Sequence, residues 1–264
     1  MSIEKHSELI VDQFTRQAIK FSEAKVIADK NSLMQLVDFS EPKTTDHVLD
    51  VACGGGIVLC GFAGKSAKVI GIDMTDAMLD TARKKIANVG LNNARVDKGT
   101  AYNLPYENEC FDIVVTRFSF HHFQEPEKAL LEMKRVCKQG GTIVVADVTA
   151  SEDEKQAACF NQMERWRDPS HVRNLSLSEL LELFKRCEFS DIHTAFYELR
   201  DVLDNLLARS FPNPGDDLRI REAFQRSLHD DCLGIPVEET NGFLEYAYPV
   251  QIIKAKKAIM VSVH

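Results

Sequence analysis

The chain has 264 residues, of which 44% are hydrophobic and 27% are charged. This composition excludes a disordered or fibrous protein and fits one large α/β domain, or a domain with a substantial insertion. The formal net charge of -8 argues against nucleic-acid binding, which needs a strongly positive face. We therefore expect a small-molecule partner and no nucleic acid.

The amino-terminal segment mixes acidic and basic side chains and lacks the apolar core of a signal peptide. No apolar run approaches the roughly 20 residues of a membrane span. The seven cysteines form no C-x-x-C pair, which favours reduced thiols and argues against a zinc site. These features predict a cytoplasmic protein without a transmembrane segment or a metal site, present as a monomer or homodimer.

Residues 4–39 have apolar side chains at helical spacing, and they predict an amino-terminal helical entry or cap segment over residues 1–40. From there to residue 149, apolar β-rich runs alternate with helix-like stretches. Strands are predicted at 47–52, 68–73, 94–97, 111–117 and 141–148, and helices at 56–64, 76–89 and 126–137. Alternation of this kind predicts a parallel sheet with covering helices.

The second part of the chain is less regular. A capping box at Ser176 and Glu179 predicts a helix that ends near Cys187, and 189–197 is predicted to be a strand that ends a core domain at 41–197. Residues 198–249 hold helical patterns interrupted by proline-containing turns, which predict a helical cap insertion. The last strand is predicted in residues 250–264 and returns to the core.

The segment VLDVACGGG, at residues 48–56, ends a predicted strand in three glycines. Glycines at a strand-to-helix turn let the backbone approach a ligand that a Cβ would exclude. Ligands of open α/β sheets bind at the carboxyl ends of strands, where this turn must lie. The next predicted strand ends in Asp73, whose carboxylate can accept both hydroxyl hydrogens of an adenosine ribose. By themselves, the glycines also fit an incidental tight turn.

A nicotinamide dinucleotide is a rival ligand for this turn. It would favour G-x-G-x-x-G, whereas Ile57, Val58 and Leu59 follow Gly56, so the third glycine is missing. Asp50, inside the first strand, would repel a pyrophosphate but suits an amino-acid ammonium. The residues therefore favour S-adenosylmethionine over a dinucleotide.

Four ordered segments, VLDVACGGG, VIGIDMTDAML, GTAYNLPYENECFDIVVTRFSFHHF and ALLEMKRVCKQGGTIVVAD, together resemble the class I S-adenosylmethionine-dependent methyltransferases. The resemblance covers roughly residues 10–195. It is closest to the ubiquinone and menaquinone C-methyltransferase branch (methyltransferase type 11), which includes many small-molecule methyltransferases. It implies a Rossmann-like, doubly wound, mostly parallel seven-stranded sheet with helices on both faces and an antiparallel last strand. The implied cofactor is S-adenosylmethionine, and its product is S-adenosylhomocysteine.

The resemblance also implies roles in cofactor binding for individual residues. Gly54 and Gly56 would face the methionine part, and Asp50 would orient its ammonium directly or through water. Asp73 would hold the ribose, and Met74 would pack on the adenine. The remaining candidates are Thr100 and Ala101 at the adenine edge, Arg117 at a strand end, and Phe21 in the entry helix.

Three of these candidates carry reservations. Thr100 stands where the family usually has an aspartate, and a hydroxyl makes a weaker contact with the adenine amino group. Phe21 stands where a tyrosine is commoner, so it can pack but cannot donate a hydrogen bond. Arg117 can also be read as a solvated arginine at a strand end.

The sulfonium of S-adenosylmethionine is intrinsically reactive, so the enzyme mainly aligns donor and acceptor and excludes water. A carbon or oxygen acceptor can still need a proton removed, and His121 and His122 are the candidate catalytic bases. Adjacent residues on a helical turn face different ways, so we expect at most one of them to point inward. The alternative is that both histidines are structural.

A second group of candidates lies in RWRDPSHVR, at residues 165–173, after the predicted fifth strand. Similar methyltransferases place part of the acceptor pocket or its lid there. Trp166, His171 and Arg173 are the candidates for binding an anionic or planar acceptor. A salt-bridged loop is the alternative, because Glu164 and Asp168 are close in sequence.

These inferences predict a methyltransferase that acts on a small-molecule acceptor, such as a quinol or a phenol, by direct in-line methyl transfer. Two alternatives stay open. Thr100 keeps a catalytically weak S-adenosylmethionine-binding protein in consideration. The missing third glycine disfavours an NAD(P)-dependent oxidoreductase.

Overall fold

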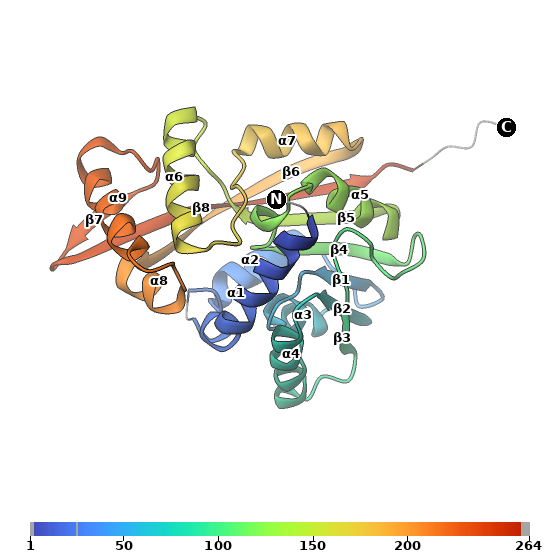
Figure 1. Cartoon of the computed structure of the whole chain (residues 1–264). Helices are drawn as coiled ribbons and strands as arrows, with labels where there is room; N and C mark the ends of the chain where they lie inside the picture. Colours follow the sequence, from blue (N-terminus) through green and yellow to red (C-terminus); the bar gives the residue numbers. More distant parts are fainter. Residues whose placement is uncertain (1–2, 25, 260–264) are drawn as a thin grey trace.

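The computed structural model describes residues 3–24 and 26–259, and its centre is one mixed β-sheet (Figure 1). Over the described residues the sheet has eight strands, in the order β3-β2-β1-β4-β5-β8-β6, with β7 paired to β8. The parallel strands are β1 (His47–Val51), β2 (Lys68–Asp73), β3 (Ala94–Lys98), β4 (Phe111–Arg117) and β5 (Cys137–Val148). The antiparallel part consists of β6 (Phe189–Val202), β7 (Val237–Thr240) and β8 (Phe243–Lys257).

Strand β1 shows how the sheet is buried on both faces. Its residue Leu49 pairs with Ile70 of β2 and Val114 of β4. Leu49 packs in the apolar cluster that contains Leu130 of α5 (Pro126–Val136), whereas the preceding residue, Val48, packs in the cluster that contains Phe62 of α3 (Ile57–Ala63). Successive side chains of a strand point to opposite faces, so both faces need covering helices. The Rossmann-like class predicted from the sequence is confirmed.

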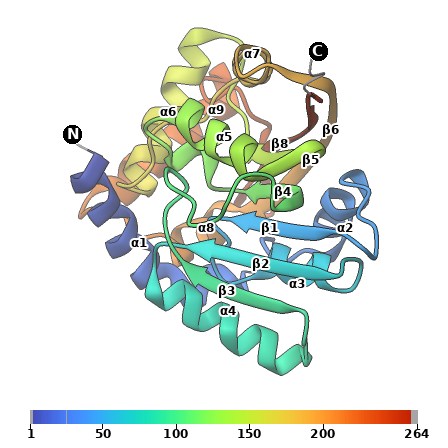
Figure 2. The ribbon, with the colours of Figure 1, turned by 90° about the vertical axis from the view of Figure 1, so that its right-hand side faces the viewer.

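The amino-terminal segment forms two helices rather than one continuous helical stretch. Helix α1 (Ile3–Glu23) is separated from α2 (Lys30–Phe39) by a turn in which the backbone N–H of Ala28 donates to the oxygen of Ala24 at 2.9 Å. The carboxylate of Asp29 caps α2 by accepting the Ser32 N–H at 2.8 Å. An amino-terminal cap of this kind starts a new helix, which explains the break. In Figure 2 the arrowheads of β1 and β2 point toward α1, so this helix lies at the carboxyl ends of the parallel strands.

The carboxyl-terminal part adds a third apolar cluster beside the sheet. Its helices are α6 (Glu154–Arg167), α8 (Leu203–Arg209) and α9 (Asp216–Asp230), while α4 (Asp76–Val89) and α7 (Leu177–Arg186) cover the sheet. The sequence pattern did not predict α6. Residues 198–249 are also less helical than expected, because β6 extends to Val202 and β8 begins at Phe243. The short strand β7 forms a hairpin with β8 and makes the sheet eight-stranded rather than seven-stranded.

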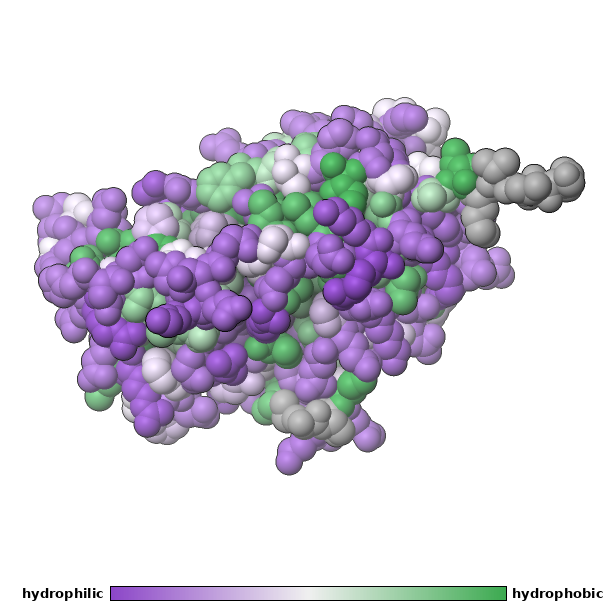
Figure 3. Space-filling view, turned by 90° about the horizontal axis from the view of Figure 1, so that it is seen from above, coloured by the Kyte–Doolittle hydropathy of each residue, from purple (hydrophilic) through white to green (hydrophobic). Residues whose placement is uncertain are grey.

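The surface is mostly hydrophilic on the face seen in Figure 3, with apolar residues in small patches. Large apolar side chains that are exposed include Val89 on α4, Leu131 on α5 and Leu218 on α9, so they are scattered over different elements. Within residues 3–24 and 26–259, no helix has the length and apolar character needed to cross a membrane.

Candidate active site

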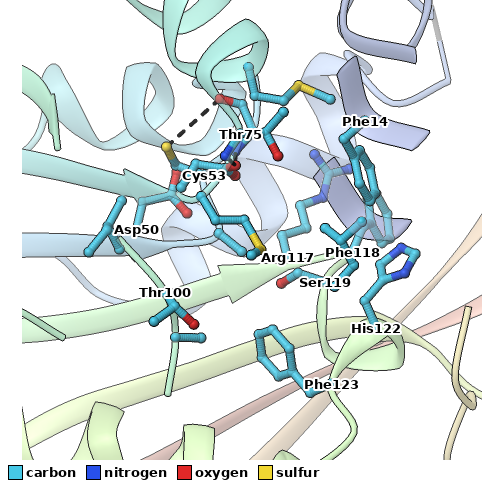
Figure 4. A pocket seen from close by; sticks show the side chains of 18 of the residues that line it. Phe14, Asp50, Cys53, Thr75, Thr100, Arg117, Phe118, Ser119, His122 and Phe123 are labelled. Atoms are coloured by element: carbon cyan, nitrogen blue, oxygen red, sulfur yellow. Dashed lines mark hydrogen bonds between the residues drawn. The ribbon is translucent and has the colours of Figure 1, made fainter. Parts of the chain in front are cut away.

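A cavity lies at the carboxyl ends of β1, β2 and β4, and we call it the first cavity. Its volume, counted with its opening to solvent, is about 1070 Å³. Its wall includes Asp50 and Thr100 on one side and Phe14, Phe118 and His122 on the other (Figure 4). The wall thus combines the turns after the parallel strands with residues of helix α1.

The glycine turn after β1 contributes to this wall through Gly54, whose φ is 49°. A Cβ added there would meet only the Sδ of Met78, at 3.8 Å, so it would project into open space. Gly56 lies elsewhere, because it is the amino-terminal cap of α3 and is absent from the wall of the first cavity. A Cβ at Gly56 would lie 3.0 Å from the Cβ of Ala82 on α4. Close packing of α3 against α4 therefore explains this glycine.

Asp73 lies in the wall at the end of β2 and holds the glycine turn in place. Its Oδ2 accepts the Gly54 N–H at 2.9 Å, and its Oδ1 accepts the Thr75 N–H at 2.9 Å. Burial raises the pKa of this carboxyl, while the two backbone donors oppose the shift. Each carboxylate oxygen has two acceptor positions, so Asp73 keeps capacity for ligand hydroxyls.

Asp50 is almost fully buried and lines the same cavity. Its Oδ2 accepts the N–H of Leu59, in the first turns of α3, at 3.0 Å. Burial raises the pKa of Asp50 to about 8, with a further contribution from the charge of Asp73, while the Leu59 hydrogen bond and the charge of Arg117 oppose the rise. A cationic ligand group next to Asp50 would therefore favour its ionised form.

Arg117 connects the wall of the cavity to the segment that joins α1 and α2. Its guanidinium donates to the backbone oxygen of Ile27 and to the Oγ of Ser32, both at 3.2 Å, and to the hydroxyl of Tyr197 at 3.3 Å. It also lies 4.4 Å from the ring centroid of Phe118. The side chain is buried, so the alternative of a solvated surface arginine is wrong.

The remaining cofactor candidates fall into two groups. Met74, Thr100 and Ala101 all line the first cavity. The side chain of Phe21 lies outside the described residues. Helix α1 instead reaches the first cavity through His6, Ser7, Ile10 and Phe14.

The two candidate bases lie on the short 3-10 helix η1 (Phe120–His122), with ring centroids 4.3 Å apart. His122 lines the first cavity and also a second cavity, whereas His121 lines only the second. The Nδ1 of His121 is 2.7 Å from the Oδ1 of Asp147, at the end of β5. The Nδ1 of His122 donates to the backbone oxygen of Ser170 at 3.0 Å. Both histidines therefore line the second cavity, although at most one was expected to point inward, and their rings have different hydrogen-bond partners.

The second cavity has a volume of about 650 Å³ when its opening to solvent is included. It shares four wall residues with the first cavity, namely Phe14, Ile27, Phe118 and His122.

The three substrate candidates, Trp166, His171 and Arg173, are absent from the walls of both cavities. Trp166 packs in the third apolar cluster, with the guanidinium carbon of Arg219 5.9 Å from its ring. The Nε2 of His171 pairs with Asn161 at 2.9 Å, and exposed Arg173 forms an ion pair with Glu179. Glu164, Arg167 and Asp168, from the same region, line the second cavity instead.

Three features of the first cavity fit S-adenosylmethionine. Gly54 leaves open the space that a Cβ would occupy, which permits close backbone approach to the methionine part. Asp50 is a buried carboxyl that would suit its ammonium, and Asp73 has acceptor positions that would suit its ribose. The fold and this site together define a Rossmann-like methyltransferase.

Comparison with known proteins gives the same class. The family model described as a methyltransferase domain matches residues 49–145. The chain is 35% identical to the uncharacterized methyltransferase YcgJ of Bacillus subtilis over 171 residues, which are 65% of this chain and 68% of that protein. It is 31% identical to the demethylmenaquinone methyltransferase of Bacillus mycoides over 123 residues, 46% of this chain and 51% of that protein.

Solved structures agree with these relatives. The crystal structure of YcgJ superposes on this chain with a TM-score of 0.80 and 27% sequence identity. The superposed region covers 87% of this chain and 99% of the YcgJ chain. A putative methyltransferase from Bacillus halodurans gives a TM-score of 0.79 at 26% identity, with coverage of 87% and 100%. The chain therefore belongs to this methyltransferase family and is an S-adenosylmethionine-dependent methyltransferase.

Gly54→Ala is expected to raise the dissociation constant for S-adenosylhomocysteine roughly tenfold, because the added methyl group projects into the first cavity. Gly90→Ala is the matched control, since Gly90 also has a positive φ, 71°, but has no heavy atom within 4 Å of an added Cβ and lies outside both cavities. Isothermal titration calorimetry checks both variants. Equal affinities in the two variants would mean that Gly54 does not contact the cofactor.

Proposed function

We propose that this methyltransferase acts on a small-molecule acceptor that binds in the second cavity. The observation that carries the proposal is the wall shared by the two cavities at Phe14, Ile27, Phe118 and His122. An acceptor in the second cavity would lie next to a cofactor in the first, which direct in-line transfer requires.

The chain's own residues contribute positioning and exclusion of water. S-adenosylmethionine supplies a methyl group on a positively charged sulfur, which needs no activation by a metal. Asp50, Gly54 and Asp73 would hold the cofactor from the ends of β1 and β2. Helix α1 forms part of the wall of both cavities, through His6 and Phe14 on the first and Phe14 and Gln17 on the second. Walls of this kind would limit the access of water as a competing acceptor.

A cavity-filling variant tests where the acceptor binds. Leu206 of α8 is buried and lines the second cavity only, so Leu206→Trp is expected to abolish methyl transfer while the affinity for S-adenosylhomocysteine stays within about twofold. Leu218→Trp on α9 is the control, because Leu218 is 62% exposed. Transfer is measured by mass spectrometry with S-adenosylmethionine and a panel of quinols, phenols and amines.

The outcomes separate the two parts of the proposal. Absence of heat on titration of S-adenosylhomocysteine into folded wild-type protein would contradict the assignment of the first cavity. Undiminished transfer by a folded Leu206→Trp protein would show that the acceptor binds elsewhere. Comparable melting temperatures of the two tryptophan variants would establish that both proteins are folded.

A further inference from the structure

His121, in the wall of the second cavity, is paired with a buried carboxylate, Asp147, that lies outside that wall. The Nδ1 of His121 lies 2.7 Å from the Oδ1 of Asp147, and the Oδ2 of Asp147 accepts the backbone N–H of His121 at 3.0 Å. The Asp147 side chain is 3% exposed and that of His121 is 10% exposed, so the histidine is the member that reaches the cavity. With Nδ1–H donating to Asp147, the Nε2 of His121 carries the lone pair.

The environment of His121 favours its cationic form. Burial lowers the pKa of His121, but the charge of Asp147 and the hydrogen bond to it outweigh burial, and the net shift is upward. The titratable and charged groups that face the ring come from β5, α6, η1 and the loop after α6. They are Asp147, Glu164, Arg167, His122 and His171.

His122 is the weaker base of the pair. Burial and the neighbouring charge of His121 lower the pKa of His122 to about 4. Its Nδ1–H donates to a neutral carbonyl, that of Ser170, rather than to a carboxylate. A base with so low a pKa holds a proton poorly at neutral pH. The edge-to-face contact of His122 with Phe14, at 5.0 Å between ring centroids, fits a wall residue between the two cavities.

Other residues of the second cavity suit a planar acceptor with a weakly acidic group. Phe14, Phe118, Tyr246 and Tyr248 supply aromatic surface. Arg167 is fixed by Glu164, which accepts from its Nε at 2.8 Å, and it would stabilise negative charge on a bound acceptor. The amide of Asn174 also lines this cavity, and its buried Oδ1 has no hydrogen-bond partner among the described residues. A ligand hydroxyl or N–H would satisfy this oxygen.

We propose that His121 is the general base of the methyltransferase, that Asp147 is its positioning residue, and that the acceptor is a planar molecule with a phenolic or enolic hydroxyl. This inference rests on the proposed function, because it needs the acceptor in the second cavity. The Nε2 of His121 takes the hydroxyl proton as the O–H bond breaks. The acceptor oxygen forms the new bond to the methyl carbon, and the sulfur–methyl bond breaks with its electron pair going to sulfur. The resulting imidazolium is paired with the Asp147 carboxylate.

The test uses the full chain loaded with S-adenosylhomocysteine and 4-nitrophenol, whose anion absorbs visible light, as the probe. At about pH 6, where most of the free probe is protonated, the wild-type complex is expected to show the phenolate band. His121→Asn is expected to lower the bound phenolate fraction at least about fivefold. With S-adenosylmethionine, it is expected to lower kcat for the probe roughly 100-fold with KM within about twofold.

Asp147→Asn is expected to shift the NMR titration of His121 and the midpoint of the kcat profile to lower pH together, which a merely structural role would not do. His193→Asn and Asp191→Asn are the matched controls, because they alter an exposed histidine–aspartate pair, 2.8 Å apart, that lies outside both cavities.

An unchanged phenolate band and an unchanged kcat in His121→Asn would overturn the assignment of the base. Failure of the loaded protein to bind 4-nitrophenol would overturn the acceptor class, whereas failure to bind S-adenosylhomocysteine would instead contradict the proposed function.

Discussion

Asp50→Asn is expected to stabilise the cofactor-free protein by an amount that grows as the pH rises from about 5 to 8. Unfolded Asp50 loses its proton near its ordinary pKa of 3.8, whereas burial raises the folded pKa to about 8. Between these pH values the folded state binds more protons at Asp50, so this residue makes the wild type less stable as the pH rises. The slope is at most about 1.4 kcal/mol per pH unit, and it vanishes above the folded pKa.

Asparagine removes this pH dependence because it does not ionise, and its amide oxygen can still accept the Leu59 N–H. The measurement is the free energy of unfolding of both proteins in urea across this pH range. A constant difference between them would contradict the raised pKa. Repeating the series with S-adenosylhomocysteine is expected to reduce the slope, because its ammonium favours the ionised carboxylate.

Asp73→Ala is expected to weaken binding of S-adenosylhomocysteine by about 1–3 kcal/mol, which is roughly five- to 150-fold in the dissociation constant. The change removes a carboxylate that faces the cavity. It also removes the acceptor of two backbone donors, Gly54 and Thr75, so the glycine turn loses its attachment to the start of α4. Calorimetry gives the dissociation constant directly.

Asp76→Ala provides the comparison for this variant. Asp76 is in the first turn of α4, three residues from Asp73, but its side chain is 71% exposed and pairs with Lys98 at 2.7 Å. Exposed ion pairs contribute little, so the affinity of this variant should stay near that of the wild type. If the Asp73→Ala protein bound as tightly as the Asp76→Ala protein, Asp73 would have no part in the site.

The parallel half of the fold was predictable because its signals are local. The predicted strands 68–73 and 111–117 agree with β2 and β4 at both ends, and the predicted helix 76–89 agrees with α4. Helix α6 was missed because its apolar residues do not form a regular stripe. It is held partly by polar contacts, such as that of Tyr248 with Glu164 at 2.5 Å. This contact joins residues that are 84 positions apart, so no local sequence pattern can predict it.

The first cavity was predictable to a large extent, because its lining residues lie near strand ends. Asp50 and Asp73 lie in the last residues of β1 and β2, Gly54 and Met74 come shortly after these strands, and all four line the cavity. The contribution of helix α1 was harder to locate. Phe14 and Phe21 are seven residues apart, close to two helical turns, so they lie near the same helix face. Periodicity cannot choose between them, and the structure places Phe14 in the wall.

The second cavity was not predicted because it needs residues from seven helices and strands, together with loop residues. Two of its charged residues, Arg167 and Asp168, lie in sequence between the candidates Trp166 and His171. Which side of that segment faces inward depends on how α6 packs against β8. Asp147 was missed for a similar reason, because its pairing with His121 crosses from β5 to η1.

Helix α1 links the two cavities. It contacts the floor of both cavities, since the Nε2 of His6 is 3.0 Å from the backbone oxygen of His122 and Gln17 donates to Asp168 at 3.4 Å. Arg117 ties the connection after this helix to β4 through the oxygen of Ile27. One helix therefore borders both proposed binding sites, so a change in its position would alter the two sites together.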